Sequence, residues 1–292
     1  MKKWGFLLLC IVGLAYVVVN KASFFQEKVK IQSYDQTAKK NFEDIGTSAT
    51  IQNTGISREQ VFQGNLLLVN QEYPVHQESI KSDVVNLFEH KELTAGFSLL
   101  ESDIYLSRDI AEKFSDMIAG AKEAGVTHFS INSGFRAFDE QDQLYQEMGP
   151  DYSLPAGFSE HNLGLSLDVG STLMKMNQAP EGKWIEKNAW AYGFILRYPQ
   201  DKTAITGIQY EPWHIRYVGL PHSAIMHEKN FALEEYLDYL KREKSISVNF
   251  NGKSYLVSYY PLSQLKDIKI PKDRHYEVSG DNMDGIIVTV FE

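Results

Sequence analysis

The chain of 292 residues is nearly free of cysteine, which excludes several kinds of chemistry. Its single cysteine, Cys10, lies in an apolar run at the N-terminus, so the remainder has no disulfide and no thiol nucleophile. Basic residues are also few, with 29 Lys and Arg against 38 Asp and Glu and a net charge of −9. Without a basic stripe, the sequence argues against nucleic acid as a partner and against strong adhesion of the soluble part to anionic lipid. Internal repeats and the helical zinc motif H-E-x-x-H are absent as well.

The N-terminus carries an uncharged run from Trp4 to Val19, which follows Lys2 and Lys3. No A-x-A cleavage site comes after the run, and "LLLC" is a poor lipobox. We therefore predict an uncleaved membrane anchor at residues 1–25, with a cleaved signal peptide as the alternative. Because positive residues stay on the cytoplasmic side, the rest of the chain is expected to be extracellular.

Three further segments follow the predicted anchor. Residues 26–60 are polar and show no sustained period, which is typical of a stalk. Residues 61–243 have the mixed patterning of a globular domain. From residue 244 to 292 the apolar period changes to two, and Asn251-Gly252 between alternating apolar residues predicts a hairpin. We interpret this last segment as a small β appendage.

Periodicity predicts the main elements of the globular part. Helices are expected at residues 108–124, 139–148, 180–192 and 230–243. Ser107 is expected to cap the first helix and Gly125 to end it. Short strands are predicted at "THFSIN", "GLSLDVG", "FILRY", "GIQY" and "WHIRYV".

A metal explains the residue pattern of "GFSEHNLGLSLDVG". Asp168 lies in the middle of a strand-like run, where a carboxylate is uncommon unless something binds it. Zinc accepts His nitrogen and Asp oxygen, and catalytic sites use three protein ligands with an open fourth position. His161 and Asp168 are two candidate ligands, with Gly164 allowing a close turn between them. The best third ligand is His214. As an alternative, the histidines are ordinary satisfied residues, since eight are present.

The segment "QYEPWHIRY" adds a candidate general base. Glu211 lies three residues before His214, and a catalytic zinc site needs a nearby carboxylate to accept the proton of water and pass it to the leaving amine. Residues three apart on a regular strand point to opposite faces. We therefore expect a bend at Pro212. Trp213 is expected to shape the pocket wall.

Arg136 is the third candidate, in "INSGFRAFDEQDQLYQEMG". It follows a predicted strand end, where its planar fork of donors can bind a carboxylate or an oxyanion. Gln141 lies five residues further on, in the first turn of the next helix. The alternative is that Arg136 only pairs with Asp139 or Glu140.

Together these motifs resemble a known family. "SEHNLGLSLD" is similar to the S-x-H-x-x-G-x-[AS]-x-D motif of the VanY-type zinc D,D-peptidases. "EPWH" resembles their E-x-W-H motif, and "SGFRAFDEQDQLY" resembles their S-G-[YF]-R-x-x-x-x-Q-x-x-L-Y motif. The resemblance covers roughly residues 61–240. The departures are Phe135, where Tyr is also common, and Ser166, where Ala is common.

The resemblance implies a fold, a metal and a reaction. It implies an α+β fold in which a small antiparallel sheet carries a zinc site flanked by helices. His161, Asp168 and His214 would hold Zn²⁺. Glu211 would act as general base and then general acid, and Arg136 would face the substrate carbonyl or carboxylate.

It also implies substrate contacts and a substrate. Gln141, Ser159, Ser166 and Trp213 would line the peptide site. The substrate would be a peptidoglycan precursor or stem peptide ending in D-Ala-D-Ala, cleaved by a membrane-anchored D,D-carboxypeptidase of glycopeptide-resistance clusters. The alternatives are an L,D-carboxypeptidase or a D,D-dipeptidase with the same zinc set, or a cell-wall-binding module without activity.

Overall fold

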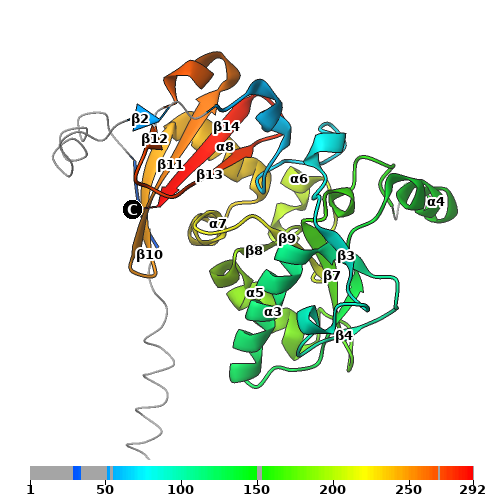
Figure 1. The fold of residues 1–292 in the computed structure, drawn as a ribbon. Helices are drawn as coiled ribbons and strands as arrows, with labels where there is room; N and C mark the ends of the chain where they lie inside the picture. The colour runs from blue at the N-terminus through cyan, green and yellow to red at the C-terminus, as the bar shows by residue number, and fades with distance from the viewer. Residues whose placement is uncertain (1–28, 34–50, 53–54, 150–152, 269, 292) are drawn as a thin grey trace, which may run out of the picture.

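A computed structural model describes residues 29–33, 51–52, 55–149, 153–268 and 270–291. These form a mixed α+β fold with two five-stranded sheets, at the upper left and the lower right of Figure 1. Among these residues, no helix has the length and apolar character needed to cross a bilayer. The anchor predicted at residues 1–25 lies outside the described residues.

The sheet that carries the candidate site has the strand order β4-β6-β7-β9-β8. Its strands are β4 (Ser98–Leu99), β6 (Phe129–Ser133), β7 (Ser166–Ser171), β9 (His214–Tyr217) and β8 (Phe194–Leu196). All pairings are antiparallel except β4 with β6, which is parallel. The predicted antiparallel sheet is therefore mixed at one edge. A separate ribbon pairs β3 (Val84–Asn86) with β5 (Tyr105–Ser107).

Six helices among the described residues pack around the two sheets. They are α3 (Arg108–Glu123), α4 (Phe138–Met148), α5 (Pro180–Asn188), α6 (Thr203–Thr206), α7 (His222–Lys229) and α8 (Leu233–Glu243). Short 3-10 turns are η2 (Arg58–Phe62), η3 (Gln77–Ser79), η4 (Lys91–Leu93), η5 (Glu160–Leu163), η6 (Ala189–Tyr192), η7 (Gln200–Lys202) and η8 (Leu262–Asp267).

Helix α3 forms as predicted, because its N-terminus is capped and one of its faces is apolar. The side-chain oxygen of Ser107 accepts a hydrogen bond from the backbone N–H of Ile110, which satisfies one otherwise free donor. Ile110, Phe114 and Met117 are fully buried in the core that also contains the strands of the site sheet. This helix thereby holds one face of the sheet in place.

Two predicted elements differ in the structure. The helix predicted at 180–192 ends at Asn188, and the chain continues as the tighter turn η6 up to Gly193, which has φ 88°. The strand predicted at "GIQY" is wrong. Helix α6 ends at Thr206, Gly207 follows with a left-handed φ of 73°, and residues 208–210 then form a loop.

The second sheet has the order β1-β10-β11-β14-β13. Its strands are β1 (Lys30–Ser33), β10 (Ser245–Phe250), β11 (Lys253–Pro261), β14 (Gly285–Phe291) and β13 (Tyr276–Gly280). The hairpin at Asn251-Gly252 is confirmed, with both residues at positive φ. A small ribbon pairs β2 (Ile51–Gln52) with β12 (Ile270–Pro271).

Strand β1 lies within residues 26–60, the segment predicted to be a polar stalk. Lys30–Ser33 pairs antiparallel with β10 along its full length, so this part of the segment belongs to the sheet. Its polar residues gave no strand signal because β1 is an edge strand with largely exposed side chains.

The second sheet packs closely on the unit that carries the site. Apolar residues of α7, α8 and the 66–68 segment share one buried cluster with β10, β11 and β14. Figure 1 shows α7 between the two sheets. Polar contacts join the same parts, since Leu66 N–H donates to Ser279 Oγ at 2.9 Å and Asn282 Nδ2 donates to the carbonyl of Leu68 at 2.9 Å.

Candidate active site

Strand register brings the central residues of the site to one level of the sheet. Asp168 on β7 lies opposite Ser133 on β6 and opposite His214 on β9. A bulge between Ile131 and Ser133 shifts the end of β6, and bulges commonly re-aim side chains beside functional sites. Asp168 therefore lies at the centre of a three-strand row.

His161 reaches this row from the turn η5, just before β7. Ser159 precedes the turn, and its Oγ accepts a hydrogen bond from His161 N–H at 3.4 Å. Gly164 ends the turn with a left-handed φ of 80°, and a Cβ there would lie 3.3 Å from Cβ of Lys81. Glycine therefore permits both the backbone conformation and the close approach that the reversal requires. The turn predicted at Gly164 is confirmed.

The ligand atoms of His161, Asp168 and His214 all lie within 4.8 Å of one another. Nε2 of His161 is 3.4 Å from Oδ2 of Asp168, and Nδ1 of His214 is 3.1 Å from Oδ1. Tetrahedral ligands at about 2.0 Å from one zinc ion would be about 3.3 Å apart. The donor set and its spacing therefore fit a zinc ion.

The second nitrogen of each histidine has its own partner. Nδ1 of His161 lies 2.6 Å from the carbonyl oxygen of Gly134, and Nε2 of His214 lies 3.4 Å from Oε2 of Glu160. Such outer partners orient metal-binding imidazoles. Burial disfavours the cation of His214, but hydrogen bonds to Asp168 and Glu160 outweigh this effect and raise its pKa to about 9.

Glu211 lies beside the three potential ligands and outside their group. Its carbonyl accepts a 3.2 Å hydrogen bond from His214 N–H, which closes a turn through Pro212 and Trp213. The predicted bend is confirmed, and it brings Oε2 of Glu211 to 4.0 Å from Nδ1 of His214. Burial raises the pKa of Glu211, which makes its carboxylate a better proton acceptor.

These residues line one cavity of about 500 Å³. Arg136 lines it too, and it donates hydrogen bonds to Oε1 of Gln141 at 2.8 Å and to Oγ of Ser133 at 2.9 Å. No ion pair between Arg136 and Asp139 or Glu140 occurs among the described residues. The guanidinium is therefore held in place while it faces the cavity.

The four predicted substrate contacts have different positions. Gln141, Ser159 and Trp213 line the cavity, and Trp213 is 40% exposed. Ser166 does not line it. This residue is completely buried, and its hydroxyl has no hydrogen-bond partner among the described residues.

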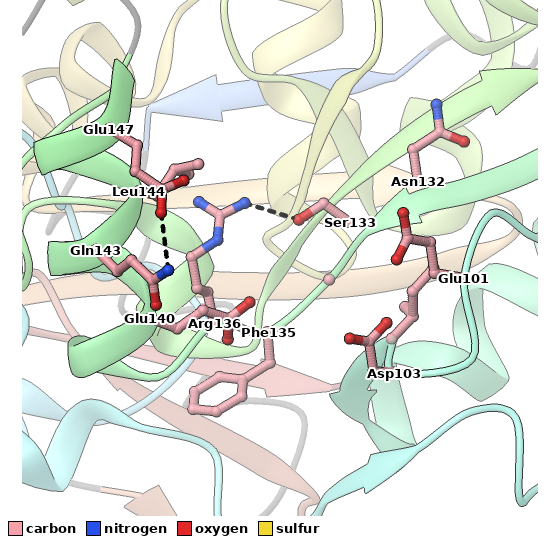
Figure 2. Close-up of a pocket in the computed structure, with 12 residues that line it drawn as sticks. Glu101, Asp103, Asn132, Ser133, Phe135, Arg136, Glu140, Gln143, Leu144 and Glu147 are labelled. Carbon is pink, nitrogen blue, oxygen red and sulfur yellow. Dashed lines mark hydrogen bonds between the residues drawn. The ribbon is translucent and has the colours of Figure 1, made fainter. Parts of the chain in front are cut away.

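A second cavity of about 350 Å³ shares Arg136 and Leu144 with the first. Figure 2 shows Arg136 between helix α4, with Glu140 and Glu147, and the opposite wall with Glu101 and Asp103. This cavity lacks the His and Asp group. The larger cavity is therefore the candidate active site.

Several residues at this site were not predicted from the sequence. Gln71, Tyr198, Ile208 and Gln209 also line the cavity. Glu160 was missed as the partner of His214, although it directly precedes His161. Two arginines in apolar strand-like runs, in "FILRY" and "WHIRY", were the available signal, because buried arginines need carboxylate partners.

Two histidines and an aspartate in one cavity, with the half-buried Glu211 beside them, define the site of a metal-dependent hydrolase. Residues 103–220 match the family model VanY, described as D-alanyl-D-alanine carboxypeptidase. A D-alanyl-D-alanine carboxypeptidase of Enterococcus faecium is 64% identical over 293 residues, covering 100% of this chain and 97% of the relative. The chain therefore belongs to the VanY family of D-alanyl-D-alanine carboxypeptidases.

Solved structures agree with this membership. The D,D-dipeptidase VanXYg, in complex with a D-Ala-D-Ala phosphinate analogue, has a TM-score of 0.69 and 31% identity, covering 81% of this chain and 97% of that one. A mutant of the D,D-pentapeptidase VanY from a VanB-type resistance cassette, in complex with Zn(II), has a TM-score of 0.50 and 27% identity, covering 59% of this chain and 98% of that one.

Proposed function

We propose that this protein is a zinc-dependent D,D-carboxypeptidase that removes the C-terminal D-Ala from peptidoglycan precursors or stem peptides ending in D-Ala-D-Ala. One observation carries the proposal. Asp168 lies between His161 and His214 at 3.4 and 3.1 Å, and Glu211 lies 4.0 Å from His214 in the same cavity. The Zn(II) complex of the VanY relative supports the choice of metal.

The residues of the chain have separable tasks. His161, Asp168 and His214 would hold the zinc, which when bound supplies Lewis-acid polarisation of the scissile carbonyl and acidifies water. Glu211 accepts a proton from the attacking water and later donates it to the departing amine of D-Ala. Arg136 stabilises the negative charge that develops on the carbonyl oxygen, because its cation is already fixed by Gln141 and Ser133.

A D,D-dipeptidase is the second candidate function. The similarity to VanXYg, a D,D-dipeptidase, favours it. Both activities cleave the same D-Ala-D-Ala bond with the same metal ligands. They therefore differ in how much peptide the cavity accepts beyond the D-Ala-D-Ala terminus.

Release of D-Ala tests both functions. The substrates are a soluble pentapeptide ending in D-Ala-D-Ala, the free dipeptide D-Ala-D-Ala and a tetrapeptide whose terminal D-Ala follows an L-residue. We expect turnover of the pentapeptide, its loss with a chelator and its recovery with zinc. Preference for the dipeptide or the tetrapeptide would replace the proposed specificity, and full activity in chelator would refute the metal.

We further propose that residues 1–25 anchor the enzyme with its catalytic domain outside the cell, where it contributes to glycopeptide resistance by depleting D-Ala-D-Ala termini. The sequence of residues 1–25 supports the anchor. Because the proposed mechanism has no serine nucleophile, turnover should be indifferent to a β-lactam. Inhibition by penicillin would contradict it.

A further inference from the structure

A fully buried carboxylate lies on the far side of His214 from Asp168. Glu160 is 1% exposed, and its Oε2 lies 3.4 Å from Nε2 of His214. On the opposite side of the same ring, Nδ1 lies 3.1 Å from Oδ1 of Asp168. A buried charge costs several kcal/mol unless other groups compensate it. The residues around Glu160 therefore show how its charge is stabilised.

Two buried arginines hold Glu160. Nε of Arg197 and Nη1 of Arg216 each donate a 2.8 Å hydrogen bond to its Oε1. Both guanidinium groups are at most 1% exposed. Because both bonds end on Oε1, the other oxygen of Glu160 remains directed at His214.

The arginines are themselves fixed by further partners. Arg197 donates to both oxygens of Glu234 on α8, at 2.7 and 3.0 Å. Nη2 of Arg216 donates to the carbonyls of Asn65 and Leu67, at 3.1 and 3.0 Å. Two positive and two negative side chains therefore form a neutral, hydrogen-bonded network behind one potential metal ligand.

The chemistry of this network dictates the state of the histidine ring. Two arginine cations keep Glu160 ionised, and an ionised carboxylate can only accept hydrogen bonds. The nitrogen of His214 that faces it must therefore carry the hydrogen. A histidine that binds zinc is neutral and carries only one hydrogen, so with zinc bound the lone pair would be on Nδ1, which faces Asp168 and His161.

We propose that Glu160 is a positioning residue that fixes the tautomer and orientation of His214 and presents its Nδ1 to the metal. This inference rests on the proposed zinc site. It also distinguishes the two histidines, because the outer partner of His161 is the neutral carbonyl of Gly134 on Nδ1. His161 therefore binds through Nε2 and His214 through Nδ1, and only His214 is supported by a carboxylate, which raises ligand basicity.

Zinc affinity, measured by competition with a chelator, tests the role of Glu160. Glu160→Gln should weaken zinc binding by about 10- to 100-fold, as is usual for loss of an outer-shell partner. Glu234→Gln is the matched control, because it removes a half-buried carboxylate from the same network without touching His214. It should keep an affinity close to that of the wild type.

The outcomes separate this inference from the proposed function. Equal losses of zinc affinity in both variants would show a general effect of charge. Unchanged zinc affinity in Glu160→Gln would show that Glu160 does not support the site. Either result would overturn the role of Glu160. A wild-type protein that binds no zinc would overturn the proposed function as well.

A second measurement needs no variant and remains decisive if Glu160→Gln fails to fold. In zinc-loaded wild-type protein labelled with ¹⁵N-histidine, two-bond ¹H–¹⁵N spectra show which ring nitrogen carries hydrogen. We expect a protonated Nε2 for His214 and a protonated Nδ1 for His161. A spectrum in which His214 is protonated on Nδ1 would overturn the assignment.

Discussion

The guanidinium of Arg136 donates a hydrogen bond of 2.8 Å to the side-chain oxygen of Gln141, and the side-chain nitrogen of Gln141 makes two further hydrogen bonds. Its Nε2 donates to Oγ of Ser153 at 3.0 Å and to the carbonyl of Leu154 at 2.6 Å. Gln141 is only 1% exposed. Gln141, which is predicted to contact the substrate, lines the cavity and also joins Arg136 to the cavity wall.

Replacing Gln141 should therefore impair catalysis through Arg136. Hydrogen bonds to charged groups contribute about 1.5–3 kcal/mol, so Gln141→Ala should lower kcat/KM about 10- to 100-fold while zinc content stays unchanged. Gln146→Ala, on the exposed side of the same helix, is the control and should leave kcat/KM unaltered. Wild-type kinetics in Gln141→Ala would show that Arg136 needs no brace.

Glu211→Gln should abolish turnover while zinc still binds, because Glu211 is the proposed base and lies outside the ligand group. General-base catalysis contributes about 10²- to 10⁴-fold, so kcat should fall by at least about 100-fold. Steady-state kinetics and metal analysis of the same sample check both parts. Retention of more than about a tenth of wild-type kcat would remove Glu211 from the mechanism.

His161→Ala and Asp168→Ala should each lose both zinc and activity, since a site with two protein ligands holds zinc poorly. Metal content after dialysis is the measurement. Asp116→Ala removes an exposed carboxylate on α3 and should retain one zinc per chain. Stoichiometric zinc in either site variant would refute the ligand assignment.

Deleting residues 1–25 should give a soluble and active enzyme, because every residue that lines the cavity lies at or after Gln71. Its rate on a short soluble peptide should match that of the full chain. On lipid-linked precursor in vesicles it should be slower, because tethering raises the effective concentration at the bilayer. Equal rates for both forms on both substrates would show that the anchor contributes nothing to catalysis.

His222 should make the protein less stable in acid. Burial lowers its pKa to about 3, and its nitrogens face the hydroxyls of Tyr236 and Thr289 at 2.7 and 3.0 Å. Between about pH 3 and the unfolded value of about 6.5, the unfolded chain binds a proton that the folded chain does not. The free energy of unfolding therefore falls with falling pH in this window and is fully restored above it.

Denaturant unfolding as a function of pH measures this effect. His222→Gln should flatten the dependence by up to about 1.4 kcal/mol per pH unit. Parallel curves for wild type and His222→Gln would contradict the proposed cause.

Much of the site could be predicted because its residues lie in short motifs whose geometry is local. The bend at Pro212 and the turn at Gly164 follow from the covalent and steric properties of proline and glycine. Ser166 is buried and does not line the cavity, which could not be foreseen because the motif gives its position but not its burial. The contact of Glu160 with Arg197 and Arg216 joins residues 37 and 56 positions apart, and no local pattern specifies such a pairing.

The fold was less predictable where tertiary contacts dominate. Helix α7 went unpredicted because most of its residues are buried, including polar His222 and Ser223, so it shows no amphipathic period. Strand β1 required β10, which lies about 200 positions later in the chain. Edge pairings of this kind depend on backbone hydrogen bonds, which every residue except proline can form.

The pairing of β1 with β10 would also limit how far from the bilayer the proposed anchor lets the enzyme work. With the proposed anchor at residues 1–25, only residues 26–29 separate it from Lys30, the first residue of β1. Four residues span at most roughly 14 Å when fully extended. The catalytic unit would therefore be kept close to the outer surface of the cell membrane. Newly exported lipid-linked precursors would be within its reach there, whereas mature cell wall further out would not.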